Sequence, residues 1–256
     1  MSSLSTRSTI LSRSSRNSSS PAHRISSVRI SRVMTIPCAM FGKLPSKRDF
    51  VAYNMVRPFL DQWEAWLQAG VASSRHTLGR RWQEIFLGFP IWRFWCGRQI
   101  FGDAVTGALM PSVDGVGRYF PLTVCACEPA DMYLEPPPSP ALDHWHEDCE
   151  RFLLHMLDDH IEREPSALLA ELSFPPVAPR LPAPQRNSGL FEWPGGDISI
   201  PDAFRSLEMA DGEARNGGRS YWWTYGGEGG HQARLVVVEG KPSAQFFEYL
   251  MTGESA

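Results

Sequence analysis

MPSVDGVGRYFPL, residues 110–122, separates two apolar runs of the chain and decides how they fold. The run at 104–110 leads into it, and the run at 119–127 leads out. Between the runs the residues are mainly Pro, Ser, Asp and Gly, the types that reverse a chain. The pattern therefore predicts two buried strands joined by a loop.

This loop carries two opposite charges, Asp114 and Arg118, beside the predicted strands. Its two glycines permit a tight turn, because glycine reaches backbone angles that other residues avoid. Two roles fit the charged pair. The side chains pair with each other, or with Lys43 and Asp49, to lock the loops at the end of the sheet. Alternatively, they face a binding partner.

Periodicity places further elements on both sides of this central pair. Strands are predicted at 37–44, 91–96, 221–225 and 234–238, with a weaker one around Ile198 and Ile200. Helices are predicted from Pro58 to about Leu78 and over 80–87, 141–163, 165–172, 202–209 and 242–251. The strands at 91–96 and 119–127 are apolar on both faces, so helices must cover both sides of the sheet. We expect a single α/β domain: a three-layer α/β/α sandwich around a mixed, largely antiparallel sheet.

The first 36 residues differ from the rest in composition. Residues 1–33 hold six Arg and no acid, so the net charge of −3 leaves about −9 on residues 34–256. We interpret 1–36 as a disordered Ser/Arg-rich tail, with an organellar transit peptide as an alternative. A wrongly assigned start is favoured, with Met34 as the true start. The acidic remainder argues against a nucleic-acid surface, which requires clustered cations.

The domain is expected to span 37–256, with a Pro-rich excursion near 173–190. This Pro-rich segment is also the best internal boundary in the chain. It is interpreted either as an excursion over the surface or as a linker. The segment after residue 190 is too small for its own core, so its strands are expected to join the same sheet. An odd number of Cys, five, indicates a reducing compartment rather than a disulfide framework. With no apolar run approaching about 18 residues, no transmembrane helix and no membrane insertion are expected.

Catalytic and metal sites have few candidates. Cys125 and Cys127 share one face of a strand, but no second pair accompanies them, and buried Cys is common. The helix at 141–163 has one polar face, made of His144, Asp148, Arg151, His155 and Asp159. This face could bind a metal, but ordinary exposed ion pairs are the favoured interpretation. No catalytic motif is present. A hydrolase or metal-dependent enzyme using Ser112, Asp114 and His residues is the alternative; no metal or cofactor is expected.

Five separate blocks of the sequence resemble the TagF (also called ImpM) accessory proteins of bacterial type VI secretion systems. They are Gly42-Lys43-Leu44-Pro45 with Asp49-Phe50, WEAWLQAG at 63–70, PIWRF at 90–94, the stretch at 110–122, and SYWWT at 220–224. The resemblance is dense over 38–127 and thin over 128–215. One position departs: the family usually has Gly before the Asp of the first block, where this chain has Arg48. If that loop is a contact surface, its preference for a partner changes.

The resemblance implies a non-enzymatic, cytoplasmic protein that acts as a post-translational negative regulator, or repressor, of type VI secretion. It implies binding to the forkhead-associated (Fha) scaffold protein and action opposite the threonine-phosphorylation pathway. The nine Trp fit either a well-anchored core or an aromatic surface that meets a partner. We therefore predict that the partner contacts the two charged loops, with the Trp pair adjacent: Lys43, Asp49, Asp114, Arg118, Trp222 and Trp223.

Overall fold

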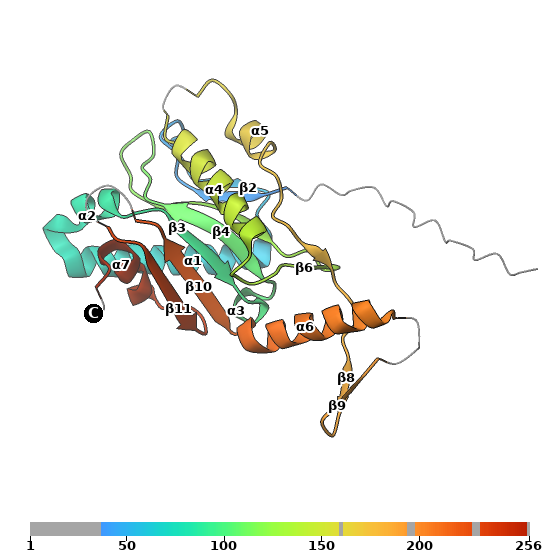
Figure 1. The fold of residues 1–256 in the computed structure, drawn as a ribbon. Helices are drawn as coiled ribbons and strands as arrows, with labels where there is room; N and C mark the ends of the chain where they lie inside the picture. The colour runs from blue at the N-terminus through green and yellow to red at the C-terminus, as the bar shows by residue number, and fades with distance from the viewer. Residues whose placement is uncertain (1–36, 159–160, 194–197, 227–230, 255–256) are drawn as a thin grey trace, which may run out of the picture. The chain divides into compact units, whose positions relative to one another are not determined.

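The computed structural model describes residues 37–158, 161–193, 198–226 and 231–254 (Figure 1). The predicted tail at 1–36 and the polar-face residue Asp159 lie outside the described residues. Residues Thr35–Ala256 form one compact unit. Among the described residues, helices long enough to cross a membrane lack the apolar character to do so, and the apolar ones are too short.

A seven-stranded sheet forms the centre of this unit, in the order β11-β10-β3-β4-β5-β1-β2. Its strands are β1 (Ala39–Gly42), β2 (Val51–Tyr53), β3 (Trp92–Cys96), β4 (Val105–Met110), β5 (Leu122–Cys127), β10 (Arg219–Thr224) and β11 (Arg234–Glu239). The predicted α/β class is confirmed, and the late strands do join the same sheet. Every pair of neighbours is antiparallel. The parallel pairing of a mixed sheet therefore does not occur among the described strands.

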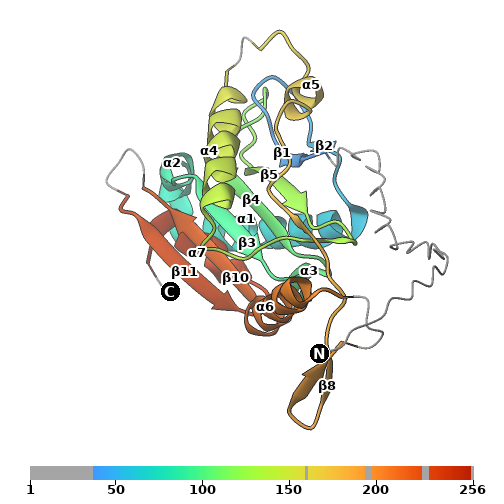
Figure 2. The same cartoon turned by 45° about the vertical axis from the view of Figure 1, so that its right-hand side comes forward.

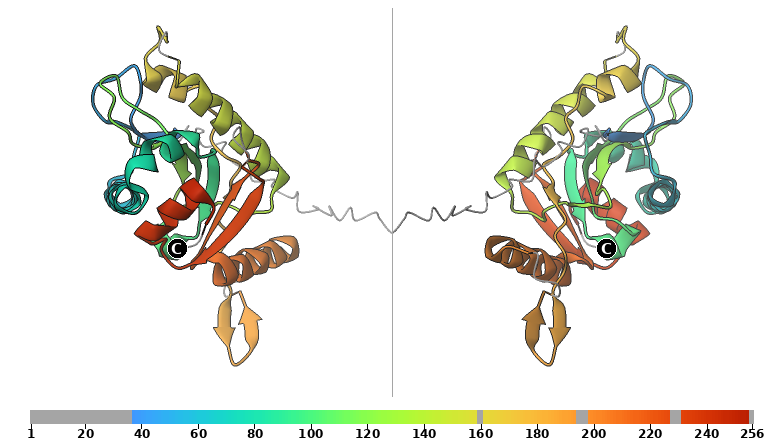
Figure 3. Two further views of the ribbon diagram at one scale, coloured as in Figure 1. Left: turned by 90° about the vertical axis from the view of Figure 1, so that its left-hand side faces the viewer. Right: turned by 90° about the vertical axis from the view of Figure 1, so that its right-hand side faces the viewer.

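One face of the sheet packs against helices from both ends of the chain. These are α1 (Arg57–Leu78), α2 (Trp82–Gly88) and α7 (Ala244–Thr252), joined or flanked by the short helices η1 (Gly79–Arg81) and α3 (Arg98–Phe101). Pro58 stands in the first turn of α1, as predicted, where its missing N–H has no helical partner. Trp63 of α1 stacks on Trp222 of β10 with ring centroids 6.1 Å apart. Figure 3 shows α1 and α7 together on this side.

The other face of the sheet packs against α4 (Pro140–His155), which lies over β4 and β5 (Figure 2). Leu142, Trp145, Cys149 and Leu153 form its buried stripe. The predicted helix over 141–163 is too long. Its apolar stripe ends at Met156, since Leu157 is 39% exposed, and Pro165 begins the separate helix α5 (Pro165–Leu169). A helix without an apolar face has little to hold it against the sheet.

The segment between α5 and β10 forms short strands and one long helix. Strand β7 (Ala178–Pro179) pairs with β6 (Met132–Tyr133), which precedes α4, and β8 (Gln185–Asn187) pairs with β9 (Leu190–Glu192). The weak strand predicted around Ile198 and Ile200 is wrong. Ser199 instead caps the helix α6 (Ile200–Asn216) by accepting a hydrogen bond from the N–H of Asp202. This helix is also longer than the predicted 202–209.

Candidate functional site

The loop between β4 and β5 is as tight as its sequence predicts. An isolated bridge joins Val113 to Tyr119. Within it, the Gly117 N–H donates to the Asp114 carbonyl at 2.9 Å. Gly117 has φ +83°, which favours glycine. Gly115 serves a different need, because a Cβ there would lie 2.8 Å from the Pro45 carbonyl oxygen. The two glycines therefore shape the turn and let another loop approach it.

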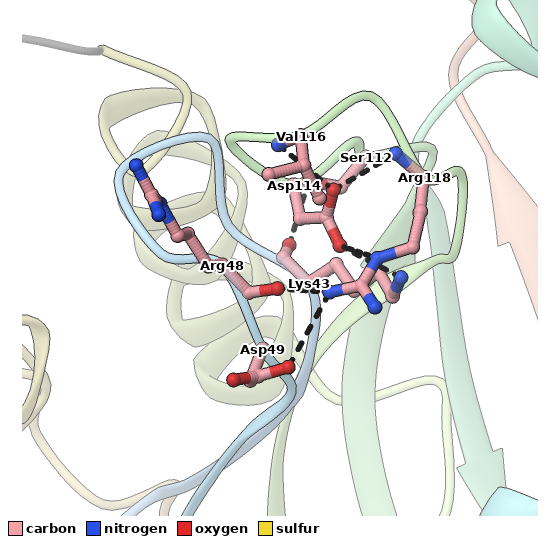
Figure 4. A network of polar contacts seen from close by, with 7 residues as sticks. All are labelled: Lys43, Arg48, Asp49, Ser112, Asp114, Val116 and Arg118. Carbon is pink, nitrogen blue, oxygen red and sulfur yellow. Dashed lines mark hydrogen bonds and ion pairs between the residues drawn. The ribbon is translucent and has the colours of Figure 1, made fainter.

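The Asp114 carboxylate organises this loop (Figure 4). Its Oδ1 accepts hydrogen bonds from the backbone N–H groups of Val116 at 3.1 Å and Arg118 at 2.8 Å. Its Oδ2 accepts from Lys43 Nζ at 2.8 Å and from Arg118 Nε at 2.7 Å. We refer to Lys43, Asp114 and Arg118 as the loop lock. Both oxygens are thus used by donors from two loops and from the backbone.

The charges of the loop lock differ in exposure. The Asp114 side chain is fully buried and that of Lys43 is 6% exposed, whereas that of Arg118 is 54% exposed. Burial by itself raises the pKa of Asp114, but the hydrogen bonds from Lys43 and Arg118 outweigh it. The net effect holds the pKa of Asp114 well below its usual value, so the carboxylate stays ionised. The lock is therefore a buried anion between two cations, one of which reaches solvent.

Further contacts fix the loop between β1 and β2 to this arrangement. The Ser112 hydroxyl donates to the Lys43 carbonyl at 2.7 Å, and the Gly115 N–H donates to the Lys47 carbonyl at 2.8 Å. Arg118 also donates to the Arg48 carbonyl and lies 3.4 Å from Asp49 Oδ1. The predicted pairing of Asp114 and Arg118 with Lys43 and Asp49 is present in the structure. Arg48 contributes its backbone carbonyl, which a glycine at that position would supply equally.

The two tryptophans predicted beside these loops do not join them. Trp222 is wholly buried, with its Nε1 donating to Ser220 Oγ at 3.0 Å. Trp223 points to the opposite face, as alternation along a strand requires, and packs edge-on against His146 at 4.8 Å. Strands β3 and β4 separate β10 from β5 in the sheet. The expected surface role of Trp222 does not fit this burial, and its neighbours show it to be part of the core.

The residues of the alternative enzymatic hypothesis have other contacts. Ser112 is 2% exposed, and its hydroxyl is already a donor to Lys43. His144 and His155 lie on α4, and His144 Nδ1 contacts the Pro140 carbonyl of its own helix at 2.7 Å. Among the described residues, His, Cys, Asp and Glu side chains do not gather in threes as metal ligands would. Cys125 and Cys127 share a face, as predicted, and burial raises the pKa of the Cys127 thiol to about 12.

Sequence reasoning missed a second charged cluster beneath α4. Arg93 of β3 is 2% exposed and its Nε donates to Glu150 Oε1 at 2.7 Å. Nearby, His146 Nε2 contacts the Thr106 hydroxyl at 3.0 Å. Burial, followed by the charge of Arg93, lowers the pKa of His146 to about 3, so the ring is neutral. We call Arg93, Glu150, His146 and Thr106 the Arg93 cluster. The sequence does contain a signal that His146 is buried, because His146 stands at helical spacing between the apolar residues Leu142 and Cys149.

Comparisons with known proteins relate these features to a family. The family model described as "TagF N-terminal domain, Type VI secretion system-associated" matches residues 39–173, which include β1 to β5 and the loop lock. A comparison with curated proteins by sequence finds no match. Among solved structures, the crystal structure of PA0076 from Pseudomonas aeruginosa PAO1, at 2.05 Å resolution, is similar with a TM-score of 0.67 and 33% identity. The match covers 86% of this chain and 96% of that one.

Proposed function

This chain belongs to the TagF family of type VI secretion system-associated proteins, and we propose that it is a non-enzymatic negative regulator that acts by binding an Fha-type scaffold protein. The observation that carries the proposal is the loop lock, which lies within the matched residues. The lock ties two loops together through hydrogen bonds and leaves the guanidinium of Arg118 at the surface, beside the 93%-exposed carboxylate of Asp49. Exposed charges on loops that are already tied together are suited to recognition, because little conformational freedom is lost on binding.

The chemistry of the same residues supports binding over catalysis. A nucleophilic Ser needs a base within hydrogen-bond reach, whereas the Ser112 hydroxyl donates to a backbone carbonyl. A general base needs a pKa near the working pH. The hydrogen-bond donors around Asp114 hold the pKa of its carboxylate well below the usual value, which makes it a weak base. Both side chains therefore serve to position the loops. The family is named for its association with a secretion system and not for a reaction.

In this proposal the protein works in the bacterial cytoplasm, after translation. Binding removes the scaffold from the assembling secretion system, and the threonine-phosphorylation pathway acts on the same scaffold in the opposite direction. The link to phosphorylation is therefore indirect, through a shared partner. The protein needs no cofactor for this role, because sequestering a partner is an equilibrium effect that depends on affinity and concentration.

The test is co-purification of the tagged full chain from cells that hold the whole secretion gene cluster. The scaffold is expected to be retained by the wild type and retained less by Arg118→Ala. Arg205→Ala is the matched control, since Arg205 is also an exposed arginine paired with a carboxylate, at 63% exposure. Overproduction is expected to lower secretion of the system's substrates. Failure of the wild-type chain to retain the scaffold would overturn the proposal.

A further inference from the structure

An open groove of about 990 Å³ lies beside the loop lock. Its walls come from three places in the sequence: the loop after β1, the loop between β4 and β5, and the end of α1 with η1 and α2. Lys43 and Arg118 of the lock line it, and so do Arg75 and Arg80 from the helical wall. The lock is thus one wall of a larger site, and the opposite wall was not identified from the sequence.

The charge of this groove is opposite to that of the protein as a whole. Four basic side chains line it, and its lining includes no Asp or Glu among the described residues. Arg75 lies over the Trp82 ring at 4.2 Å. Within the described part of the chain, Arg75 and Arg80 form no ion pair, and both are exposed. Because residues 34–256 carry about −9, this basic groove is a local exception.

The floor of the groove is aromatic. Phe50 is 45% exposed, although it packs edge-on against Phe120 at 4.8 Å and stacks on Phe41 at 5.7 Å. The ammonium of Lys43 lies 5.0 Å from the centre of its ring. An exposed ring that is already held by its neighbours loses little freedom on binding, as is typical of side chains that dominate protein interfaces. The groove therefore combines two arginines that form no ion pair among the described residues, Arg75 and Arg80, with an apolar contact held by its neighbours.

We propose that this groove binds an acidic segment of a partner protein. Arg75, Arg80 and Arg118 contact its carboxylates, and Phe50 packs against one of its apolar side chains. The inference rests on the proposed function in taking a protein as the partner. Nucleic acid is disfavoured because the acidic remainder of the surface repels a phosphate backbone. A flat anionic membrane is disfavoured because the cations line a concave site.

The test starts with a random twelve-residue peptide library displayed on phage and selected on the immobilised full chain. Peptides rich in Asp and Glu with an apolar or aromatic residue are expected. Their binding is expected to weaken with salt, as exposed charge pairs do. The double charge reversal Arg75→Glu with Arg80→Glu should weaken binding by about tenfold or more, because like charges then face each other.

Two controls separate local contact from general charge. The double variant Arg151→Glu with Arg205→Glu changes the net charge equally at exposed positions outside the groove, and should leave peptide binding unchanged. Phe50→Ala should weaken binding without altering charge. Selected peptides without acidic enrichment would overturn the proposal. So would equal binding by the groove variant, or binding to phosphatidylserine vesicles in place of peptides.

Capture of the Fha-type scaffold distinguishes this inference from the proposed function. If the wild type and the Arg75→Glu, Arg80→Glu variant retain the scaffold equally, the groove is overturned as its binding site and the proposed function stands. If neither retains it while acidic peptides still bind the groove, the proposed function fails and the groove stands. Circular dichroism of each variant confirms that the chain is folded, which is expected because both arginines are exposed.

Discussion

The loop lock and the Arg93 cluster each contain an arginine–carboxylate ion pair, but the buried member is the carboxylate in one and the arginine in the other. In each, an arginine Nε lies 2.7 Å from a carboxylate oxygen. In the loop lock the carboxylate is buried and Arg118 is 54% exposed. In the Arg93 cluster the arginine is 2% exposed, and the carboxylate of Glu150 is 26% exposed. One pair therefore presents a cation at the surface and the other presents an acid.

This difference indicates which member of each pair is needed for the fold. Removing a buried charge leaves its partner without compensation, and the cost depends on how far water reaches that partner. Removing an exposed charge leaves the buried one with its other polar partners. The four predictions below test this distinction, from the largest expected effect to the smallest.

Asp114→Ala is expected to cause the largest loss of stability. It removes the acceptor of four hydrogen bonds and leaves the 6%-exposed ammonium of Lys43 without its partner. The expected loss is about 3 kcal/mol, at the low end for a broken buried pair because solvent reaches the Arg118 side. Urea denaturation followed by fluorescence measures it. Ser112→Ala, which removes a single donor of the same loop, is the control and should cost far less.

The two clusters should also respond to pH in different windows. His146 has a pKa lowered to about 3, so the unfolded chain binds a proton that the folded chain does not. Stability should therefore fall on acidification from about 6.5 towards 3, at most by about 1.4 kcal/mol per pH unit. His146→Gln should remove this slope. The pKa of Asp114 is lowered too, but an acid's contribution is lost only below about pH 4.

Denaturation of both proteins at pH 7, 6 and 5 measures the His146 effect. Asp114→Asn is the contrasting variant, since its difference from the wild type should stay constant over this range and shrink only at lower pH. An unchanged slope in His146→Gln would contradict burial as the reason for the neutral ring.

Arg93→Met is expected to cost about 1–2 kcal/mol, which is less than Asp114→Ala although Arg93 is the more buried arginine. The carboxylates it leaves are partly hydrated, at 26% exposure for Glu150 and 45% for Asp143. In addition, its NH1 is buried without a hydrogen-bond partner within the described structure, so its removal relieves a cost. Thermal unfolding measures the change. A loss as large as that of Asp114→Ala would break the comparison.

Arg118→Ala is expected to affect stability least and binding most. The exposed guanidinium contributes little to folding, and Asp114 keeps its bonds from Lys43 and the backbone. Retention of the scaffold should nevertheless fall while the unfolding midpoint moves only slightly. Arg118→Lys serves as the conservative variant and should recover part of the binding. Equal loss of stability in Arg118→Ala and Asp114→Ala would contradict the division of roles.

Local chemistry in the sequence predicted much of the fold. The turn residues of 110–122 indicated strand, loop and strand, and Pro58 marked the start of α1, because both signals depend only on near neighbours. The end of α4 and the extent of α6 were wrong. The length of a helix depends on which of its apolar residues pack against the rest of the folded unit. Apolar residues can continue at helical spacing in the sequence beyond the point where that packing stops.

The candidate site was predicted only in part. Opposite charges at Asp114 and Arg118, with Lys43 and Asp49 in another loop, suggested the pairing that the structure contains. The burial of Trp222 was not recognised, since an aromatic strand reads alike in a core and at a surface. Arg75 and Arg80 were not among the predicted site residues. Their place in the groove arises when the end of α1 meets the β4–β5 loop, a contact between distant segments.

Loops are usually where a family accepts insertions, and the loop lock removes that freedom. The Asp114 carboxylate accepts hydrogen bonds from the backbone N–H groups of Val116 and Arg118, from the Arg118 side chain, and from the Lys43 ammonium of another loop. One extra residue between Asp114 and Arg118 would break several of these bonds together. The spacing of the two residues is therefore fixed by geometry, whereas the exposed hairpin of β8 and β9 is under no comparable constraint among its described residues.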